Sequence, residues 1–174
     1  MAKIVIIGAG AMGSAFALPC LDNNHDVNIV GTHLENDFIE QLKNNNNLHP
    51  GLNTQIPQEV KILKFDKFEE LLKSNVDLIV LGISSKGIEW VSDQLSKLYK
   101  DTAIPKLLML TKGLSIYNNK YELLVDKLER LLEDRGIKET IISAVGGPCL
   151  ATGLANRVHS SVVIANKDIQ TAKK

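Results

Sequence analysis

Short apolar runs recur along the chain and alternate with polar or amphipathic stretches. The runs are rich in β-branched residues and leucine, and they cover Ile4–Ile7, Val27–Val30, Val60–Leu63, Leu78–Leu81, Leu107–Leu110 and Ile141–Val145. Strands of a parallel sheet that helices cover on both faces have such predominantly apolar sequences, whereas a strand with one wet face alternates. The runs therefore predict buried parallel strands, and a further strand is expected over Ser160–Ala165.

The stretches between these runs predict helices. The expected helices are Ala11–Asn23, Glu35–Lys43, Phe68–Ser74, Ile88–Leu98 and Tyr121–Asp134. In the last of them, Leu124, Leu128 and Leu131 fall on one side, as they do in a helix that packs on a core. Alternating strands and helices are typical of βαβ units. The sequence thus predicts an α/β fold of the Rossmann type: a doubly wound, mainly parallel sheet with helices on both faces.

Two stretches fall outside this pattern. The polar run Asn44–Asn47 leads to His49, Pro50 and Gly51, which is most simply a surface loop. Near the end, Lys167–Gln170 is typical of a helix start that the sequence does not complete. We expect residues 1–174 to form one domain that ends near a domain boundary.

Composition narrows the class of protein. Hydrophobic residues make up 44% and charged residues 23% of the chain, which is ordinary for a soluble globular protein. Basic and acidic residues balance at 20 each, so no nucleic-acid partner is expected. No apolar stretch reaches the roughly 20 residues of a membrane-spanning helix, so no membrane insertion is expected. Two cysteines, Cys20 and Cys149, fit a reduced cytoplasmic setting. The histidines lack ligand spacing, so we predict no metal.

A glycine pattern follows the first predicted strand. Gly8, Gly10 and Gly13 match the G-x-G-x-x-G fingerprint of dinucleotide sites, and a helix of small residues follows them. Gly8 permits a tight turn, Gly10 lets a pyrophosphate approach the backbone, and Gly13 permits close packing of helix on strand. The free amides and the positive end of the helix dipole then face the phosphates. NAD(P) is the expected cofactor.

The end of the second strand bears on which dinucleotide is used. NAD-specific sites place an acidic residue there on the ribose hydroxyls. Here the segment reads Val30, Gly31, Thr32, His33, without an acid. Thr32 and His33 can donate to a 2′-phosphate, so the segment favours NADPH slightly over NADH. Two alternatives stay open: His33 as an ordinary loop residue, and Glu35 turning towards the ribose.

Three further segments carry a resemblance to a known family. They are Leu81–Ser85 after the fourth predicted strand, Thr111-Lys112-Gly113-Leu114 after the fifth, and Gly146-Gly147-Pro148-Cys149-Leu150-Ala151 after the sixth. In this order, behind an N-terminal glycine loop, they resemble the NAD(P)-dependent glycerol-3-phosphate dehydrogenases over essentially the whole chain. The resemblance implies hydride transfer between NAD(P)H and dihydroxyacetone phosphate, giving the sn-glycerol 3-phosphate used in phospholipid synthesis.

The resemblance also implies roles for single residues. Lys112 matches a lysine that touches both cofactor and substrate, and its ammonium can stabilise charge on a phosphate or on a carbonyl oxygen. Gly147 matches a glycine at the substrate, and Ala151 a position close to the cofactor. Ala11 and Met12 match residues along the dinucleotide, and Thr32 one at its adenosine end.

The chain departs from the family at several of these positions. Cys149 stands where the family usually has a hydroxyl that binds substrate, and a thiol is a weaker donor. Ser84 and Gly146 replace a frequent proline and serine. The family's all-helical second domain, which supplies the general acid/base lysine, lies outside these residues. We therefore expect the isolated chain to bind dinucleotide and to turn over little or no substrate, and a homodimer of the full-length protein stays open.

Two rival functions remain at this level. A ketopantoate-reductase-like NADPH-dependent reductase has a glycine loop even closer to this one. Thr111-Lys112-Gly113 followed by Gly146-Gly147-Pro148 favours the phosphate dehydrogenase. A non-catalytic nucleotide-sensing module fits a chain without a second domain, but it leaves Lys112 and the Gly147-Pro148 turn without a purpose.

Overall fold

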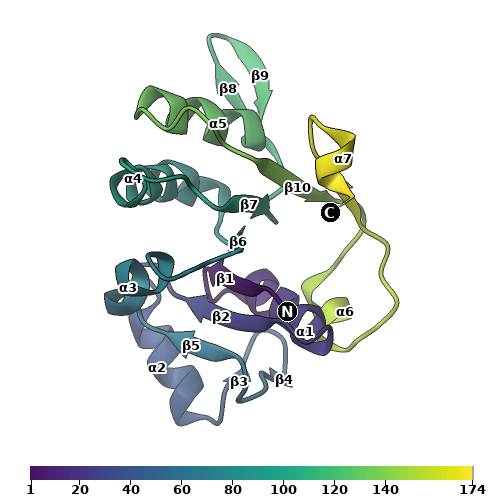
Figure 1. Ribbon diagram of the computed structural model, residues 1–174. Helices are drawn as coiled ribbons and strands as arrows, with labels where there is room; N and C mark the ends of the chain where they lie inside the picture. The colour runs from purple at the N-terminus through teal and green to yellow at the C-terminus, as the bar shows by residue number, and fades with distance from the viewer. Residues whose placement is uncertain (174) are drawn as a thin grey trace.

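A seven-stranded sheet forms the centre of the computed structural model, which describes residues 1–173 (Figure 1). Its strands lie in the order β5-β2-β1-β6-β7-β10-β11. Their bounds are β1 Lys3–Ile7, β2 Asp26–Val30, β5 Lys61–Leu63, β6 Leu78–Leu81, β7 Lys106–Met109, β10 Ile142–Gly146 and β11 Val163–Ala165. Every pairing is parallel except that of β10 with β11. The predicted doubly wound, mainly parallel sheet is confirmed.

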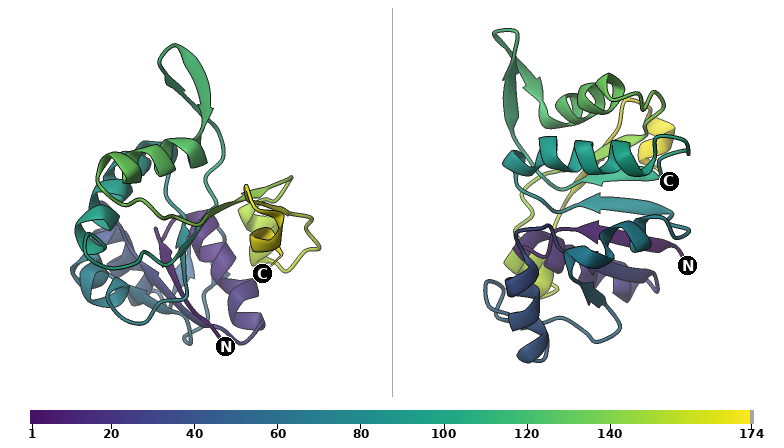
Figure 2. Two further views of the ribbon diagram at one scale, coloured as in Figure 1. Left: turned by 45° about the horizontal axis from the view of Figure 1, so that its top comes forward. Right: turned by 90° about the vertical axis from the view of Figure 1, so that its left-hand side faces the viewer.

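Helices cover both faces of this sheet (Figure 2). The helices of the described residues are α1 Ala11–Asp22, α2 Asn36–Asn44, α3 Phe68–Leu72, α4 Ile88–Leu98, α5 Leu124–Asp134, α6 Ala151–Ala155 and α7 Ile169–Ala172, of which α6 packs against α1. Successive residues of β1 point to opposite faces: Ile4 and Ile6 join the core under α1 and α2, and Val5 and Ile7 join the core under α3, α4 and α5. Burial on both faces explains the predominantly apolar strand sequences.

The stretch after α2 is not the surface loop that its polar sequence suggests. It forms a small hairpin, β3 (Leu48–His49) with β4 (Thr54–Gln55), and His49 is only 3% exposed. Asn46 and Asn47 both have positive φ, 49° and 58°. Asparagine tolerates this left-handed conformation better than most residues. The asparagine run therefore turns the chain back so that His49 enters the interior.

A second hairpin replaces the first turn of the helix predicted over Tyr121–Asp134. Strands β8 (Leu114–Tyr117) and β9 (Lys120–Leu123) stand out from the molecule in the right-hand view of Figure 2, and α5 begins only at Leu124. Asn118 and Asn119 connect the strands with φ of 49° and 60°. Two such residues suit the two-residue turn that matches the twist of a hairpin.

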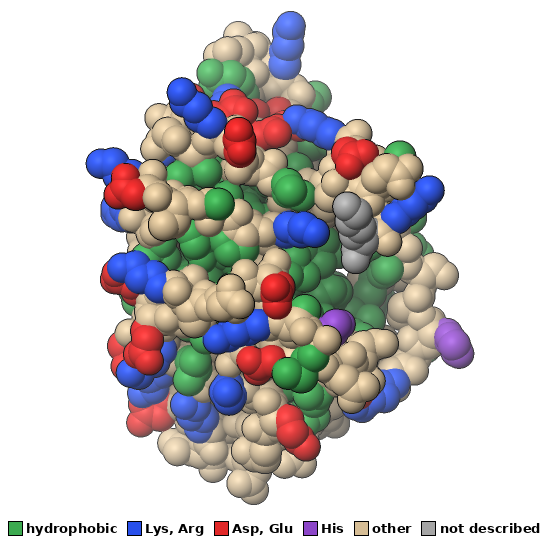
Figure 3. Space-filling view, viewed as in Figure 1, with side chains coloured by type: hydrophobic (Ala, Val, Ile, Leu, Met, Phe, Trp, Pro, Cys, Tyr) green, Lys and Arg blue, Asp and Glu red, His purple; other side chains and the backbone are tan. Residues whose placement is uncertain are grey.

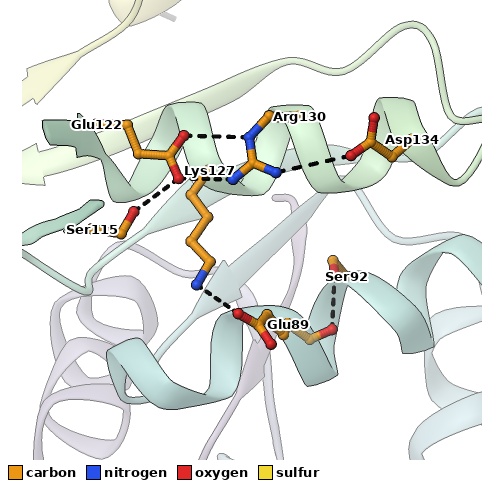
Figure 4. Close-up of polar contacts among 7 residues, drawn as sticks. All are labelled: Glu89, Ser92, Ser115, Glu122, Lys127, Arg130 and Asp134. Carbon is orange, nitrogen blue, oxygen red and sulfur yellow. Dashed lines mark hydrogen bonds and ion pairs between the residues drawn. The ribbon is translucent and has the colours of Figure 1, made fainter. Parts of the chain in front are cut away.

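Arg130 of α5 holds this hairpin against the body of the protein. Its guanidinium lies 2.8 Å from a carboxylate oxygen of Glu122 (Figure 4) and 3.7 Å from the centre of the Tyr117 ring. On the same helix, Lys127 pairs with Glu89 of α4 at 2.8 Å. The two contacts join the hairpin to α5 and α5 to α4.

A hollow of about 350 Å³ opens beside α7 at the amino ends of the central strands. Apolar side chains gather in it (Figure 3), and Ile4, Leu78, Leu108 and Ile164 are among those that line it. The hollow lies at the opposite end of the strands from the glycine loop. Within residues 1–173, no helix is long and apolar enough to cross a membrane.

Glycines allow the first turn of α1 to lie directly on the sheet. A Cβ on Gly13 would come within 2.3 Å of the Gly8 carbonyl oxygen, and one on Gly82 within 2.8 Å of the Gly13 Cα. Gly8 itself has a φ of +105°, which L side chains rarely adopt. The predicted tight turn at Gly8 and the close helix packing at Gly13 are therefore present.

We expect Gly13→Ala to lower the free energy of unfolding by about 3 kcal/mol, because the added methyl group meets backbone that cannot rotate away. Gly10→Ala is the matched control, since a Cβ there has no neighbour within 4 Å, and it should cost less than about 1 kcal/mol. Urea denaturation of both variants measures the difference. Equal losses would show that the close packing does not limit residue size.

Candidate functional site

The carboxyl ends of the parallel strands meet at one edge of the sheet. β1 pairs with β2 on one side and with β6 on the other. The chain leaves β1 towards α1 on one face and leaves β6 towards α4 on the opposite face. Ligands of open α/β sheets bind in the crevice outside such a switch point. The glycine loop lies at this place.

The glycine loop leaves backbone amides free for a ligand. Gly10 is the N-cap of α1 with an extended backbone (φ −65°, ψ 174°), and no described side chain caps the helix there. The first amides of a helix have no partner within the helix, and the dipole makes them attractive to anions. A Cβ at Gly10 would point into open space. The sequence predicts the diphosphate of a dinucleotide at this place, along Gly10, Ala11 and Met12, and this contact stays a prediction.

Two buried side chains contact Ala9. Its carbonyl oxygen accepts a hydrogen bond from the Ser14 hydroxyl at 3.0 Å and lies 3.2 Å from Nε2 of His49. Ser14 is completely buried and His49 nearly so. Nδ1 of His49 has no partner among the described residues. Burial lowers the pKa of His49 below its ordinary value of 6.5, and the bond to Ala9 opposes this shift only in part.

Glu35 contacts the amide of the same residue, Ala9. One of its carboxylate oxygens accepts the Ala9 amide at 3.0 Å, and the other accepts the Thr32 amide at 2.7 Å. No acid lies within Val30–His33 of the sequence. The fold nevertheless brings the Glu35 carboxylate to the place where β1 and β2 both end. The sequence left Glu35 open as an alternative contact of the ribose, and the structure places its carboxylate beside the glycine loop. The signal for it in the sequence is an acid at the start of the predicted helix Glu35–Lys43.

His33 lies apart from this group. The residue is exposed, and its ring centre lies 5.2 Å from that of Trp90 and 6.1 Å from that of Phe65. The ring therefore belongs to an aromatic cluster at the ends of β2 and β5. Its predicted contact with a 2′-phosphate stays a prediction.

Lys112 and Gly147 come together across the ends of β7 and β10. The Lys112 ammonium donates to the Gly147 carbonyl oxygen at 2.6 Å. Thr111 donates through its hydroxyl to the Ile83 carbonyl at 2.5 Å, which ties the same turn to the end of β6. Gly147 has a φ of +96°, so its turn needs glycine. The predicted cation and the predicted substrate turn are neighbours.

Cys149 and Ala151 follow this turn. The Cys149 amide donates to the Gly147 carbonyl at 3.0 Å, and its side chain is 6% exposed. α6 begins at Ala151, so Cys149 precedes the helix and does not form part of its first turn. Ala151 and Ala11, two predicted cofactor residues, both pack against the buried cluster between α6 and α1. No group of three or more potential metal ligands occurs within residues 1–173.

Comparison with known families matches nearly the whole chain. Residues 3–172 match the model of the family described as the N-terminus of NAD-dependent glycerol-3-phosphate dehydrogenase. The NADP(+)-dependent glycerol-3-phosphate dehydrogenase of Archaeoglobus fulgidus is 29% identical over 171 residues, which cover 98% of this chain and 48% of that protein. The glycerol-3-phosphate dehydrogenase [NAD(P)+] of Shouchella clausii is 28% identical over 177 residues, with coverages of 99% and 48%. The chain thus spans about half the length of these curated relatives.

Solved structures show the same fold. Glycerol-3-phosphate dehydrogenase from Coxiella burnetii superposes with a TM-score of 0.78 at 23% identity, over 99% of this chain and 49% of that one. The enzyme from Saccharomyces cerevisiae gives 0.67 at 18% identity, over 94% and 47%. At these identities the superpositions support the arrangement of strands and helices.

The buried His49 makes stability sensitive to pH. Its pKa is lowered in the folded chain, so neutral His49 stabilises the fold above the unfolded-state pKa of 6.5, and this contribution is lost as pH falls. We expect urea denaturation to show a larger loss of stability from about pH 7.5 to about pH 5.5 in the wild type than in His49→Leu. The exposed His33→Gln should behave like the wild type. Equal pH dependence in wild type and His49→Leu would contradict the assignment.

Proposed function

We propose a function from one premise: the chain belongs to the family described as the N-terminus of NAD-dependent glycerol-3-phosphate dehydrogenase. We infer that it is the dinucleotide-binding part of an oxidoreductase that transfers hydride between NAD(P)H and dihydroxyacetone phosphate. The observation that carries this proposal is the glycine loop at the switch point of the sheet. Its helix start is uncapped, and Gly10 opens onto free space.

The loop is proposed to hold the diphosphate of NAD(P). The amides of Ala11, Met12 and Gly13 begin α1 and offer donors to phosphate oxygens. Gly8 and Gly13 set the path of the chain beneath them. Ala151 of α6 is proposed to line the site, since it packs against the same cluster as Ala11. When bound, reduced NAD(P)H supplies the hydride.

Lys112 is proposed to be the catalytic cation of this half. The Gly147 carbonyl fixes its ammonium at the carboxyl ends of β7 and β10. There the ammonium is placed to stabilise negative charge on a phosphorylated substrate or on its carbonyl oxygen. Gly147 and Cys149 belong to the same turn, and we propose that they line the substrate side. The proposed role of Lys112 requires a substrate that is small and negatively charged.

The second half of the reaction is proposed to lie outside residues 1–174. Curated relatives are about twice as long, since the chain covers 48% of the first two. We propose that their additional domain supplies the general acid/base and completes the substrate site. The product, sn-glycerol 3-phosphate, would feed glycerophospholipid synthesis in the cytoplasm.

Dinucleotide binding is the first test. We expect the chain to bind NADH or NADPH in a fluorescence or calorimetric titration, and Gly10→Val to weaken the binding about 10- to 100-fold. The side chain would displace one charge-assisted hydrogen bond worth about 1.5–3 kcal/mol. Ala103→Val, at an exposed position between α4 and β7, is a control that adds methyl groups away from the loop. Unchanged binding by a folded Gly10→Val variant would refute the proposed loop site.

Catalysis is the second test. We expect residues 1–174 with NADH or NADPH and dihydroxyacetone phosphate to show no turnover above background, because the acid/base group lies elsewhere. The assay follows nicotinamide absorbance, with ketopantoate as the alternative substrate. Turnover of dihydroxyacetone phosphate by this chain alone would contradict the division of labour between the two halves.

A further inference from the structure

We propose that Glu35 selects NADH over NADPH by occupying the place where the 2′-phosphate of NADPH would lie. This inference rests on the proposed function, because it presumes that a dinucleotide binds at the glycine loop. It reverses the preference that the sequence of Val30–His33 favours. The carboxylate comes from the residue that precedes α2 and not from the strand end itself.

The position of the carboxylate carries the proposal. Its two oxygens bridge the Ala9 amide after β1 and the Thr32 amide after β2, at 3.0 and 2.7 Å. In dinucleotide sites of this fold, an acid beside the glycine loop at the end of the second strand accepts the adenosine 2′-hydroxyl. Each carboxylate oxygen has a further lone pair beyond the one that its amide uses. Glu35 can therefore accept a ribose hydroxyl without giving up its own partners.

The charge of Glu35 opposes a phosphate at this place. The ion pairs formed within residues 1–173 do not include Glu35. A 2′-phosphate carries negative charge and brings only acceptors towards a group that is itself an acceptor. The Thr32 amide, one of the donors available to a phosphate, already donates to Glu35. Electrostatics and hydrogen bonding thus disfavour the same ligand.

The backbone around Glu35 holds the carboxylate in place before any ligand arrives. A Cβ on Gly31 would lie 2.3 Å from Ile39 Cδ1 and 3.3 Å from Glu35 Cβ, so glycine lets the start of α2 approach β2 closely. Asn36 accepts the Phe65 amide at 2.9 Å and anchors the same turn to the end of β5. The Glu35 carbonyl accepts the Ile39 amide at 2.9 Å. Such preorganisation keeps the selecting charge at the site.

The test compares binding of NADH and NADPH by titration, without any substrate. We expect the wild type to bind NADH about tenfold or more tightly than NADPH, and Glu35→Gln to shift the ratio of dissociation constants about tenfold towards NADPH. Glutamine keeps an acceptor and removes the charge. Glu35→Asp, which keeps the charge, should retain a preference for NADH. Glu40→Gln, on an exposed part of α2, is the matched control and should leave the ratio unchanged.

Each outcome bears on a different claim. An unchanged ratio in a Glu35→Gln variant that melts like the wild type would overturn the role of Glu35. Equal or tighter binding of NADPH by the wild type would overturn it even if the variant fails to fold. Failure of the wild type to bind either dinucleotide would instead overturn the proposed function, and this inference with it.

Discussion

The close contact between the start of α1 and the ends of β1 and β6 determines the rest of the site. Backbone meets backbone at Gly8, Gly13 and Gly82, where side-chain atoms would overlap with neighbouring main chain. Because the helix lies this low on the sheet, its uncapped first turn faces the crevice between the two halves of the fold. An anion site at a helix start depends on such an exposed row of amides.

The two peptide groups on either side of Ala9 are the second constraint, and residues far apart in the sequence hold them in place. Ser14 in α1 and His49 in the β3–β4 hairpin meet the Ala9 carbonyl oxygen, while Glu35 before α2 accepts the Ala9 amide. The bonds orient the loop without using the amides of Ala11 and Met12. An ordered loop loses less conformational entropy when a ligand binds than a mobile one does. The hairpin thus contributes to the site although it lies outside the fingerprint.

The sequence predicted what depends on local patterns and missed what depends on contacts between distant segments. The six central strands and α4 were predicted closely, because apolar runs with burial on both faces are a strong local signal. The β8–β9 hairpin was missed because Asn118 and Asn119 form its turn without a glycine. The burial of His49 depends on the contact between the β3–β4 hairpin and the glycine loop, and the bridging position of Glu35 depends on the neighbouring ends of β1 and β2. Neither contact can be predicted from residue spacing along the chain.

Opposite charges lie at different points along the carboxyl edge of the sheet, so the two ends of the crevice differ in charge. Glu35 lies at the end of β2, and Lys112 follows β7. Two strands, β1 and β6, lie between them, so three strand spacings of about 4.8 Å separate the two ends by roughly 14 Å. The glycine loop lies between these two ends, at the end of β1.

A dinucleotide held at its diphosphate would then place a neutral ribose against the carboxylate and its reactive end towards the ammonium. The opposite orientation would bring the phosphorylated substrate of the proposed reaction beside Glu35, where charge repulsion opposes it. In the proposed complex, the loop would hold the diphosphate, and the two charges would determine the orientation of the ligand.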